Sequence, residues 1–296
     1  MSARFEYEAH YFEVCGHRMH YIDEGVGPAV VFLHGNPSWT FGWRNVIPLV
    51  SKVARVIAVD MIGMGRSDKP DLPYSYFLHL GYLFRFLEAM KLDRYVLAVH
   101  DWGSALGLSI AMRQPDQVRA MALMETFTVN RIVPTEFQQP TPWNESMWDL
   151  CQRIIDPAHG PDLVLELDAF NDSIQTMTER ELSPEEIAGY KSPYLTPGNR
   201  QAQLAWPFQV LGPEDAIVGN LVEFDRHGPF LQRATFPRLL LHGSAGMVND
   251  TNVAWYRTQV PGLEVVRVGS GYHYIQEDQP EVIGRAIADW VVRLPA

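Results

Sequence analysis

The chain has 296 residues, of which 47% are hydrophobic and 20% charged, and its formal net charge is −11. This is globular composition, with enough length for one large domain or a domain carrying a sizeable insertion. The acidic balance argues against nucleic-acid binding, which requires a basic face. No run of about 18 apolar residues occurs, so no membrane-spanning helix is expected.

Cysteine usage and short motifs restrict the chemistry further. Cys15 and Cys151 are the only cysteines, which predicts no disulfide framework and favours a reducing compartment, the cytoplasm. The first residues, MSARFEYEAHYFEV, lack a basic stretch followed by an apolar one, so no secretory signal is expected. No HExxH, CxxC or GxGxxG-after-strand pattern appears, so no metal or cofactor is implied. A monomer is the expected state.

The first part of the chain predicts a hairpin and then alternating strands and helices. HYFEVCGHRMHYIDEG alternates around a turn, as a hairpin does. Continuous apolar runs that end in glycine or a polar residue predict buried parallel strands. They occur at 29–35, 55–60, 95–100 and 117–126, and helical patterns at 43–50, 76–92 and after residue 101. The alternation predicts an α/β fold with a mostly parallel central sheet flanked by helices.

The pattern changes between residues 127 and 212. No buried-strand signal occurs there, and the stretches 143–155, 161–177 and 183–190 are helical in character. Ser183, followed by Pro184, Glu185 and Glu186, is a good helix start. Strand and helix patterns return at 237–246, 250–259, 263–271 and 280–294. We therefore predict a core domain of residues 1–126 and 213–296, with a helical cap of residues 127–212 inserted in it.

Asp101 is the candidate nucleophile. In an open parallel sheet, functional residues lie at the carboxyl ends of the strands. Asp101 stands between a predicted strand and a helix opened by small residues, which is the layout of the nucleophile elbow with Asp in place of Ser. The helix N-terminus favours the ionised carboxylate, which can attack carbon directly. The alternative is that Asp101 only caps the helix.

His273 and Glu125 are the candidate partners of Asp101. In this fold the chain order is nucleophile, acid, histidine, and His273 lies in the loop between the last strand and the last helix. No carboxylate follows the strand at 237–243, and Asp250 is interpreted as a helix cap. Glu125 closes an apolar strand, where a carboxylate without a partner is costly and an imidazole removes that cost. Asp60 is the competing acid and is interpreted as structural.

Asn36 and Trp102 are the candidate donors. Their backbone N–H groups are expected to form an oxyanion hole. Their side chains add an amide N–H and an indole N–H, two neutral donors that suit a departing halide ion. Packing under the cap is the alternative role of Trp102.

Five motifs, HGNP…WRN, DMIGMGRSDKPD, HDWGSALG, ALMET and HYIQEDQPEVIG, together resemble the haloalkane dehalogenases of the α/β-hydrolase superfamily. The resemblance implies Asp101 as nucleophile, His273 as base and Glu125 as acid, with Asn36 and Trp102 binding halide. It implies hydrolysis of a carbon–halogen bond to alcohol, halide and a proton, through an alkyl ester on Asp101 that water activated by His273 hydrolyses. The implied substrate is a small apolar halogenated molecule.

The same resemblance extends into the cap. It implies that Pro207 in LAWPFQV and Phe170 in LDAFND line the pocket, and Trp206 is expected to add apolar lining. Three features depart from the family pattern: Trp39 replaces a small residue, GSAG replaces a Pro-Gly turn, and residues 134–159 match poorly. They concern the pocket and its entrance rather than the chemistry.

Three other functions remain open on this scaffold. An epoxide hydrolase shares the Asp–His–acid logic and needs cap tyrosines, for which Tyr190 and Tyr194 are the candidates. A luciferase-like oxygenase keeps the same triad. A non-catalytic ligand receptor would need no complete set of nucleophile, base, acid and donors.

Overall fold

The computed structural model of the protein describes residues 2–138 and 141–295. Within them, eight strands form one sheet in the order β1-β2-β4-β3-β5-β6-β7-β8. The pairs β1–β2 and β2–β4 are antiparallel, and all other pairs are parallel. The strands are β1 His10–Val14, β2 His17–Glu24, β3 Ala29–Leu33, β4 Arg55–Val59, β5 Tyr95–His100, β6 Val118–Met124, β7 Arg238–Gly243 and β8 Leu263–Gly269. The predicted α/β fold and the N-terminal hairpin are both confirmed.

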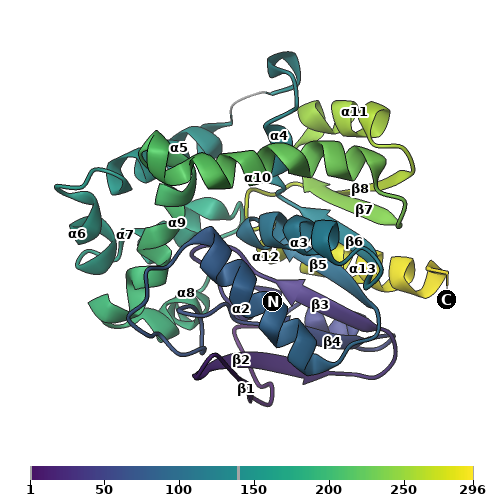
Figure 1. Cartoon of the computed structure of the whole chain (residues 1–296), viewed down its shortest axis with the longest axis horizontal. Coiled ribbons are helices and arrows are strands. Elements are labelled where there is room, and N and C mark those ends of the chain that lie inside the picture. The colour runs from purple at the N-terminus through teal and green to yellow at the C-terminus, as the bar shows by residue number, and fades with distance from the viewer. Residues whose placement is uncertain (1, 139–140, 296) are drawn as a thin grey trace.

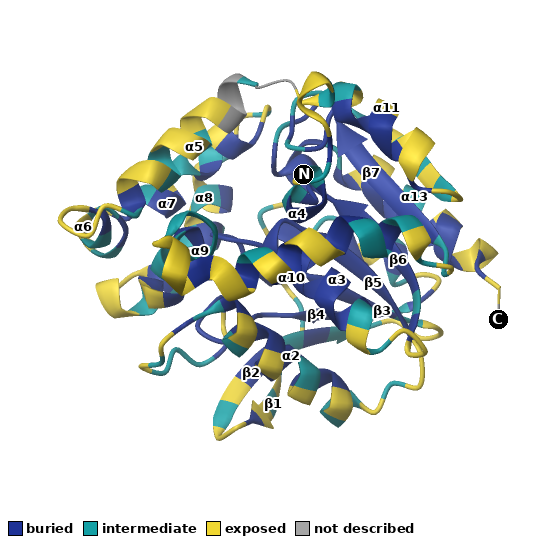
Figure 2. Ribbon diagram, turned by 45° about the horizontal axis from the view of Figure 1, so that its top comes forward, coloured by how far each residue is buried: buried dark blue, intermediate teal, exposed yellow. Residues whose placement is uncertain are grey.

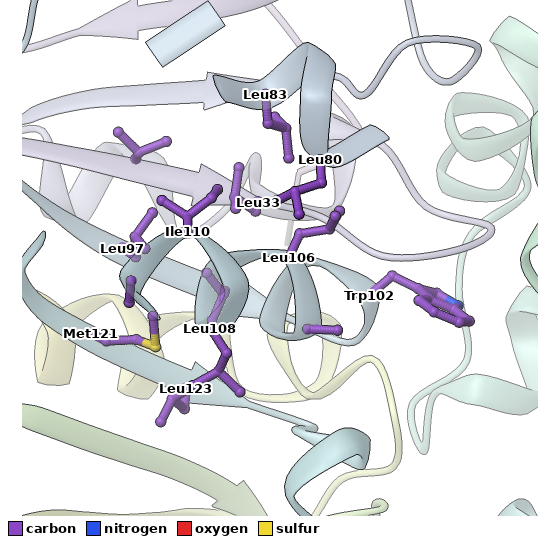
Figure 3. Close-up of a cluster of buried hydrophobic side chains, with 14 of the residues drawn as sticks. Leu33, Leu80, Leu83, Leu97, Trp102, Leu106, Leu108, Ile110, Met121 and Leu123 are labelled. Carbon is purple, nitrogen blue, oxygen red and sulfur yellow. The ribbon is translucent and has the colours of Figure 1, made fainter. Parts of the chain in front are cut away.

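Helices cover both faces of the sheet because its central strands are apolar on both sides. Val31 and Leu33 of β3 pack on one face, and Val30 and Phe32 on the other. The first face is covered by α2 (Tyr76–Met90) and α3 (Trp102–Arg113), whose leucines lie over the strands in Figure 3. The second face is covered by α1 (Ile47–Val50) and α13 (Pro280–Arg293). The central strands are buried between helices whose outer faces are exposed (Figure 2).

Between β6 and β7 every described element is helical. These elements are α4 Phe127–Asn130, η2 Thr135–Phe137, α5 Pro142–Ile154, α6 Gly160–Leu165, α7 Ala169–Asp172, η3 Ser173–Met177, α8 Pro184–Lys191, η4 Ser192–Tyr194, η5 Pro197–Arg200, α9 Gln201–Leu211 and α10 Glu214–Arg233. Helices α5 to α9 gather on one side of the sheet, and α10 runs back past α3 (Figure 1). The division of the chain at residues 126 and 212 stays a prediction.

The remaining elements follow the parallel strands near the C-terminus. They are α11 (Asp250–Gln259) after β7 and α12 (Ile275–Asp278) after β8. Earlier in the chain, η1 (Thr40–Trp43) follows β3. No helix in the described residues is long and apolar enough to cross a membrane.

Two local expectations differ from the structure. The stretch 161–177 is three short helices, because the backbone at Asp168 turns left-handed, with φ of 56°. The Asp168 carboxylate there accepts from Asn171 Nδ2 at 2.5 Å and pairs with Arg200 at 3.0 Å. Asp250 is not the cap of α11: Asn249 is the N-cap, its side chain accepting from the Thr251 N–H.

Candidate active site

Asp101 lies at a sharp turn between β5 and α3. Its backbone has φ of 54° and ψ of −123°, outside both the helical and the extended regions. The helix begins close behind β3 because Gly103 has no side chain: a Cβ there would lie 2.4 Å from the Leu33 carbonyl oxygen. This is the strand–turn–helix geometry of a nucleophile elbow. The turn leaves Asp101 6% exposed, at the wall of a cavity.

The two carboxylate oxygens of Asp101 have different surroundings. Oδ1 accepts the Asn36 backbone N–H at 2.9 Å, and Oδ2 lies 3.5 Å from His273 Nε2. Burial raises the pKa of Asp101 above its usual range, although the charge of His273 and the N–H groups of Asn36 and Trp102 lower it. The helix N-terminus therefore does not fully offset the cost of burying this carboxylate.

His273 and Glu125 form a buried pair. His273 Nδ1 lies 2.9 Å from Glu125 Oε2. Because a carboxylate only accepts, Nδ1 carries a proton and donates it to Glu125, and Nε2 faces Asp101. Glu125 also accepts the backbone N–H groups of Met247 at 2.8 Å and Val248 at 3.1 Å. The carboxylate that closes β6 thus has the partners that its complete burial requires.

A cavity of about 560 Å³ joins these groups to the helical region. Asn36, Asp101, Trp102 and His273 line it, and Phe170 of α7 and Pro207 of α9 complete the lining from the opposite side, with other largely apolar side chains. This size and character suit a small apolar ligand held by a few polar groups.

Asn36 and Trp102 both reach the cavity wall. Asn36 Nδ2 donates to the Gln203 carbonyl oxygen at 3.3 Å, which leaves one amide hydrogen for another acceptor. The Trp102 ring packs against Phe127 and Trp206, with centroid distances of 4.9 and 4.5 Å. The indole is 7% exposed and lies at the end of α3 nearest the helical region (Figure 3).

Two tryptophans singled out in the sequence lie outside the cavity lining. Trp206 packs behind Trp102, stacks on His79 at 4.4 Å, and donates from Nε1 to Met64 Sδ at 3.2 Å. Trp39 is buried against Phe5 of the N-terminal segment, with a ring-centroid distance of 4.9 Å. Neither side chain is among the residues that line the cavity.

The two cap tyrosines are also outside the lining, and their hydroxyls already have partners. The Tyr190 hydroxyl donates to Glu277 Oε1 at 2.6 Å. The Tyr194 hydroxyl accepts the Gly65 N–H at 2.9 Å.

Asp60 is held in a separate buried cluster. Its oxygens accept from the Thr40 N–H at 2.7 Å and the Arg66 N–H at 2.8 Å, and His20 Nδ1 lies 2.8 Å away. Burial alone would raise the pKa of Asp60, but the hydrogen bond and charge of His20 hold it well below its usual range. Asp60 does not line the cavity, in agreement with a structural role.

Sequence reasoning missed three groups that hold the site. The N–H donors of Met247 and Val248 are backbone atoms in a loop, and no residue type signals them. Gln203 lies four residues before Pro207 on α9, so helical spacing would have placed it on the same face.

No cluster of three or more His, Cys, Asp or Glu side chains able to hold a metal ion occurs within the described ranges.

Comparison with known proteins places the chain among its relatives. The family described as the alpha/beta hydrolase fold matches residues 28–280. A haloalkane dehalogenase of Bradyrhizobium diazoefficiens is 35% identical over 100% of this chain and 98% of its own. One of Sphingobium indicum is 37% identical over 97% of this chain and 96% of its own. The solved structure of haloalkane dehalogenase DbeA from Bradyrhizobium elkani is similar with a TM-score of 0.88 and 31% identity, covering 98% of this chain and 99% of that one.

Proposed function

The chain belongs to the haloalkane dehalogenase family of the α/β-hydrolase fold, and on that premise we propose that it hydrolyses carbon–halogen bonds. The products are an alcohol, a halide ion and a proton. The observation that carries the proposal is the carboxylate of Asp101 at the elbow, facing an apolar cavity beside two neutral N–H donors.

In the first step, Asp101 displaces the halide. Oδ2 is the attacking atom, because Oδ1 is already held by the Asn36 N–H. The new C–O bond forms as the carbon–halogen bond breaks, and the electron pair leaves with the halide. The Asn36 amide and the Trp102 indole stabilise this anion without neutralising the nucleophile. A cavity that excludes water strengthens both interactions.

In the second step, His273 activates water to hydrolyse the alkyl ester. Nε2 takes a proton from water, whose oxygen attacks Cγ of Asp101. The negative charge develops on Oδ1, where the backbone N–H groups of Asn36 and Trp102 receive it. Glu125 stabilises the imidazolium and fixes the tautomer of the ring through the 2.9 Å bond to Nδ1. The Cγ–Oδ2 bond then breaks and regenerates the carboxylate, with the oxygen of water in the place of Oδ2. The alcohol leaves with one proton of that water, and the other proton is released to solvent.

The site supports this reaction better than epoxide hydrolysis. An epoxide hydrolase needs an acid that protonates the opening ring oxygen, and the candidates were Tyr190 and Tyr194. Their hydroxyls bond to Glu277 and to the Gly65 N–H, and neither residue lines the cavity. The luciferase-like alternative shares the triad, and no observation favours it over the dehalogenase.

The substrate is a small apolar halogenated molecule, which the size and lining of the cavity support. We place the protein in the cytoplasm as a monomer, and the unpaired Cys15 and Cys151 support the reducing compartment. Gel filtration with light scattering measures the oligomeric state, and a dimer mass would contradict the monomer.

The activity is tested with a panel of 1-chloro- and 1-bromoalkanes of increasing length. We expect halide release and acidification in a one-to-one ratio. Epoxides serve as the competing panel. Turnover of an epoxide without halide release from any haloalkane would reject the proposal.

The covalent step is tested with His273→Phe. Because only the second step needs the base, the alkyl ester on Asp101 accumulates, and mass spectrometry detects the added alkyl group on the peptide that contains it. His273→Phe combined with Asp101→Asn is the matched control and gains no mass. Alkylation of a different residue would exclude Asp101 as the nucleophile.

A further inference from the structure

The loop that carries His273 is attached to the helical region between β6 and β7. It follows β8 and continues into α12, so its position is not fixed by strand pairing. Its residue Tyr274 donates its backbone N–H to the Met177 carbonyl oxygen at 2.8 Å. The backbone of the base is therefore held from two sides, because His100 Nε2 of β5 donates to the His273 carbonyl oxygen at 2.7 Å and Tyr274 bonds the helical region.

Asp278, at the end of α12, bridges the two segments. Oδ1 accepts the backbone N–H groups of Glu179 and Arg180, both at 3.0 Å. Oδ2 accepts the backbone N–H of Tyr272 at 3.0 Å and that of Glu179 at 3.1 Å. Tyr272 directly precedes His273. One buried carboxylate thus fixes both the start of the base-bearing loop and the segment that follows η3.

Glu277, the residue before Asp278, also holds α12 in place. Glu277 is fully buried and accepts from Arg44 Nη2 at 2.9 Å, Arg180 Nη2 at 2.5 Å and the Tyr190 hydroxyl at 2.6 Å. Arg180 contributes to both attachments, since its N–H bonds Asp278 and its guanidinium bonds Glu277. The loop is consequently held by charge-assisted bonds in a buried environment, where such bonds are strong.

We propose that Asp278 is a positioning residue for the base: its carboxylate holds the Tyr272–His273 segment against residues 179–180, so that the imidazole stays between Glu125 and Asp101. The inference rests on the proposed function, in which His273 acts only in the second step. Loss of Asp278 should therefore slow ester hydrolysis and leave halide displacement unchanged. A displacement of the order of 1 Å in a reacting group can lower a rate by about 100-fold.

Asp278→Asn is the informative variant. Asparagine has the shape of aspartate but only one acceptor oxygen, so it cannot accept all three N–H groups. With that oxygen in the place of Oδ1 it loses the Tyr272 N–H, and in the place of Oδ2 it loses the Arg180 N–H. Asp278→Ala, which removes both acceptor oxygens, is the second variant. Thermal unfolding shows whether each variant is folded. The matched control is Asp250→Asn, which removes an exposed carboxylate at the start of α11 that pairs with Arg267 at 2.8 Å.

The measurement is rapid-quench kinetics on a 1-bromoalkane, which separates the halide burst from steady-state turnover. In Asp278→Asn we expect an unchanged burst rate, a steady-state rate lower by about tenfold or more, and alkyl-enzyme visible by mass. Asp250→Asn should behave as wild type in both phases. If the halide burst and the steady-state rate fell equally in the folded variants, Asp278 would be a structural residue and the inference would be overturned. The inference would also be overturned if neither rate changed. If wild-type protein releases no halide, the proposed function fails instead, which is a separate outcome.

Discussion

At the scale of single residues, Asp101 combines two opposing requirements. In the proposed mechanism it has to be ionised to attack carbon, and it has to be buried so that water does not weaken the attack. Burial raises its pKa, and the bonds and charges around it recover only part of the cost. The carboxylate also sits in a backbone conformation that non-glycine residues seldom adopt, with φ of 54°. Function therefore costs stability at this position.

Asp101→Asn is expected to raise stability at neutral pH by about 1 kcal/mol, because it removes a buried charge and keeps one acceptor for the Asn36 N–H. Since the folded pKa of Asp101 is raised, wild-type protein loses stability as pH rises from the ordinary carboxyl range through the folded pKa. The advantage of the variant should be complete above that pKa and vanish below the ordinary range. Thermal unfolding from pH 3 to 8 measures it, and a difference that does not vary with pH would contradict the argument.

The same shift predicts the pH dependence of halide displacement. Only ionised Asp101 attacks, so the displacement rate should fall on the acid side at a pH above the usual titration range of aspartate. Single-turnover halide release in His273→Phe isolates this step from ester hydrolysis, which needs the base. Replacing the histidine also removes a charge that lowers the pKa of Asp101, so the variant should titrate higher still. A rate that stays constant into the ordinary carboxyl range would show that Asp101 is not perturbed.

The candidate residues of the site could be named from the sequence, whereas the groups that orient them could not. Asp101, Glu125 and His273 follow from strand ends and chain order, and the structure brings the three together. The N–H groups of Met247 and Val248, which hold Glu125, depend on the path of a loop. A backbone N–H donor cannot be recognised from the type of residue that carries it.

At the scale of elements, the loop after β7 holds Glu125, the proposed triad acid, through backbone N–H groups. Gly246 lies against the Glu125 carboxylate, and its neighbours supply the N–H donors. The departure GSAG, noted in the sequence as a change of turn, therefore lies in direct contact with the acid.

Gly246→Ala should displace Glu125, because an added Cβ would lie 2.4 Å from Oε1. The His273 bond then lengthens, and we expect ester hydrolysis to fall by about tenfold while the halide burst is retained. Gly198→Ala is the control, since a Cβ there meets nothing within 4 Å. Rapid-quench kinetics on both variants checks the prediction, and wild-type turnover in Gly246→Ala would refute it.

Two elements have the bounds that the sequence predicts. β5 and α11 have the predicted bounds, Tyr95–His100 and Asp250–Gln259. The stretch 161–177 differs from its prediction, because Asp168 satisfies a tertiary network with Asn171 and Arg200 that local helical propensity does not encode. Propensity predicted helix there, and tertiary hydrogen bonding divided it.

At the scale of the whole molecule, a buried ion cluster joins segments far apart in the chain. Arg44 and Glu277 come from segments next to the sheet, and Arg180 and Glu186 from between β6 and β7. The two positive charges of the arginines equal the two negative charges of the glutamates. Such a cluster contributes little net stability when complete, but removing one member leaves a buried charge without its partner.

Glu186→Gln tests this cluster through the acid dependence of stability. Burial alone would raise the pKa of Glu186, but hydrogen bonds from Arg180 and Ser183 and the charges of Arg180 and Arg44 lower it to about 2. A lowered pKa stabilises the fold above the ordinary glutamate range, and the stabilisation is lost as pH falls through that range toward the folded pKa. At pH 7 the variant should melt several degrees lower, of the order of 3 °C. Between pH 5 and 3 its Tm should fall less steeply than that of wild type.

Glu281→Gln, which removes an exposed carboxylate 3.6 Å from Arg285, is the control and should leave both the Tm at pH 7 and its acid dependence unchanged. Parallel Tm profiles for wild type and Glu186→Gln would mean that Glu186 does not carry this acid dependence.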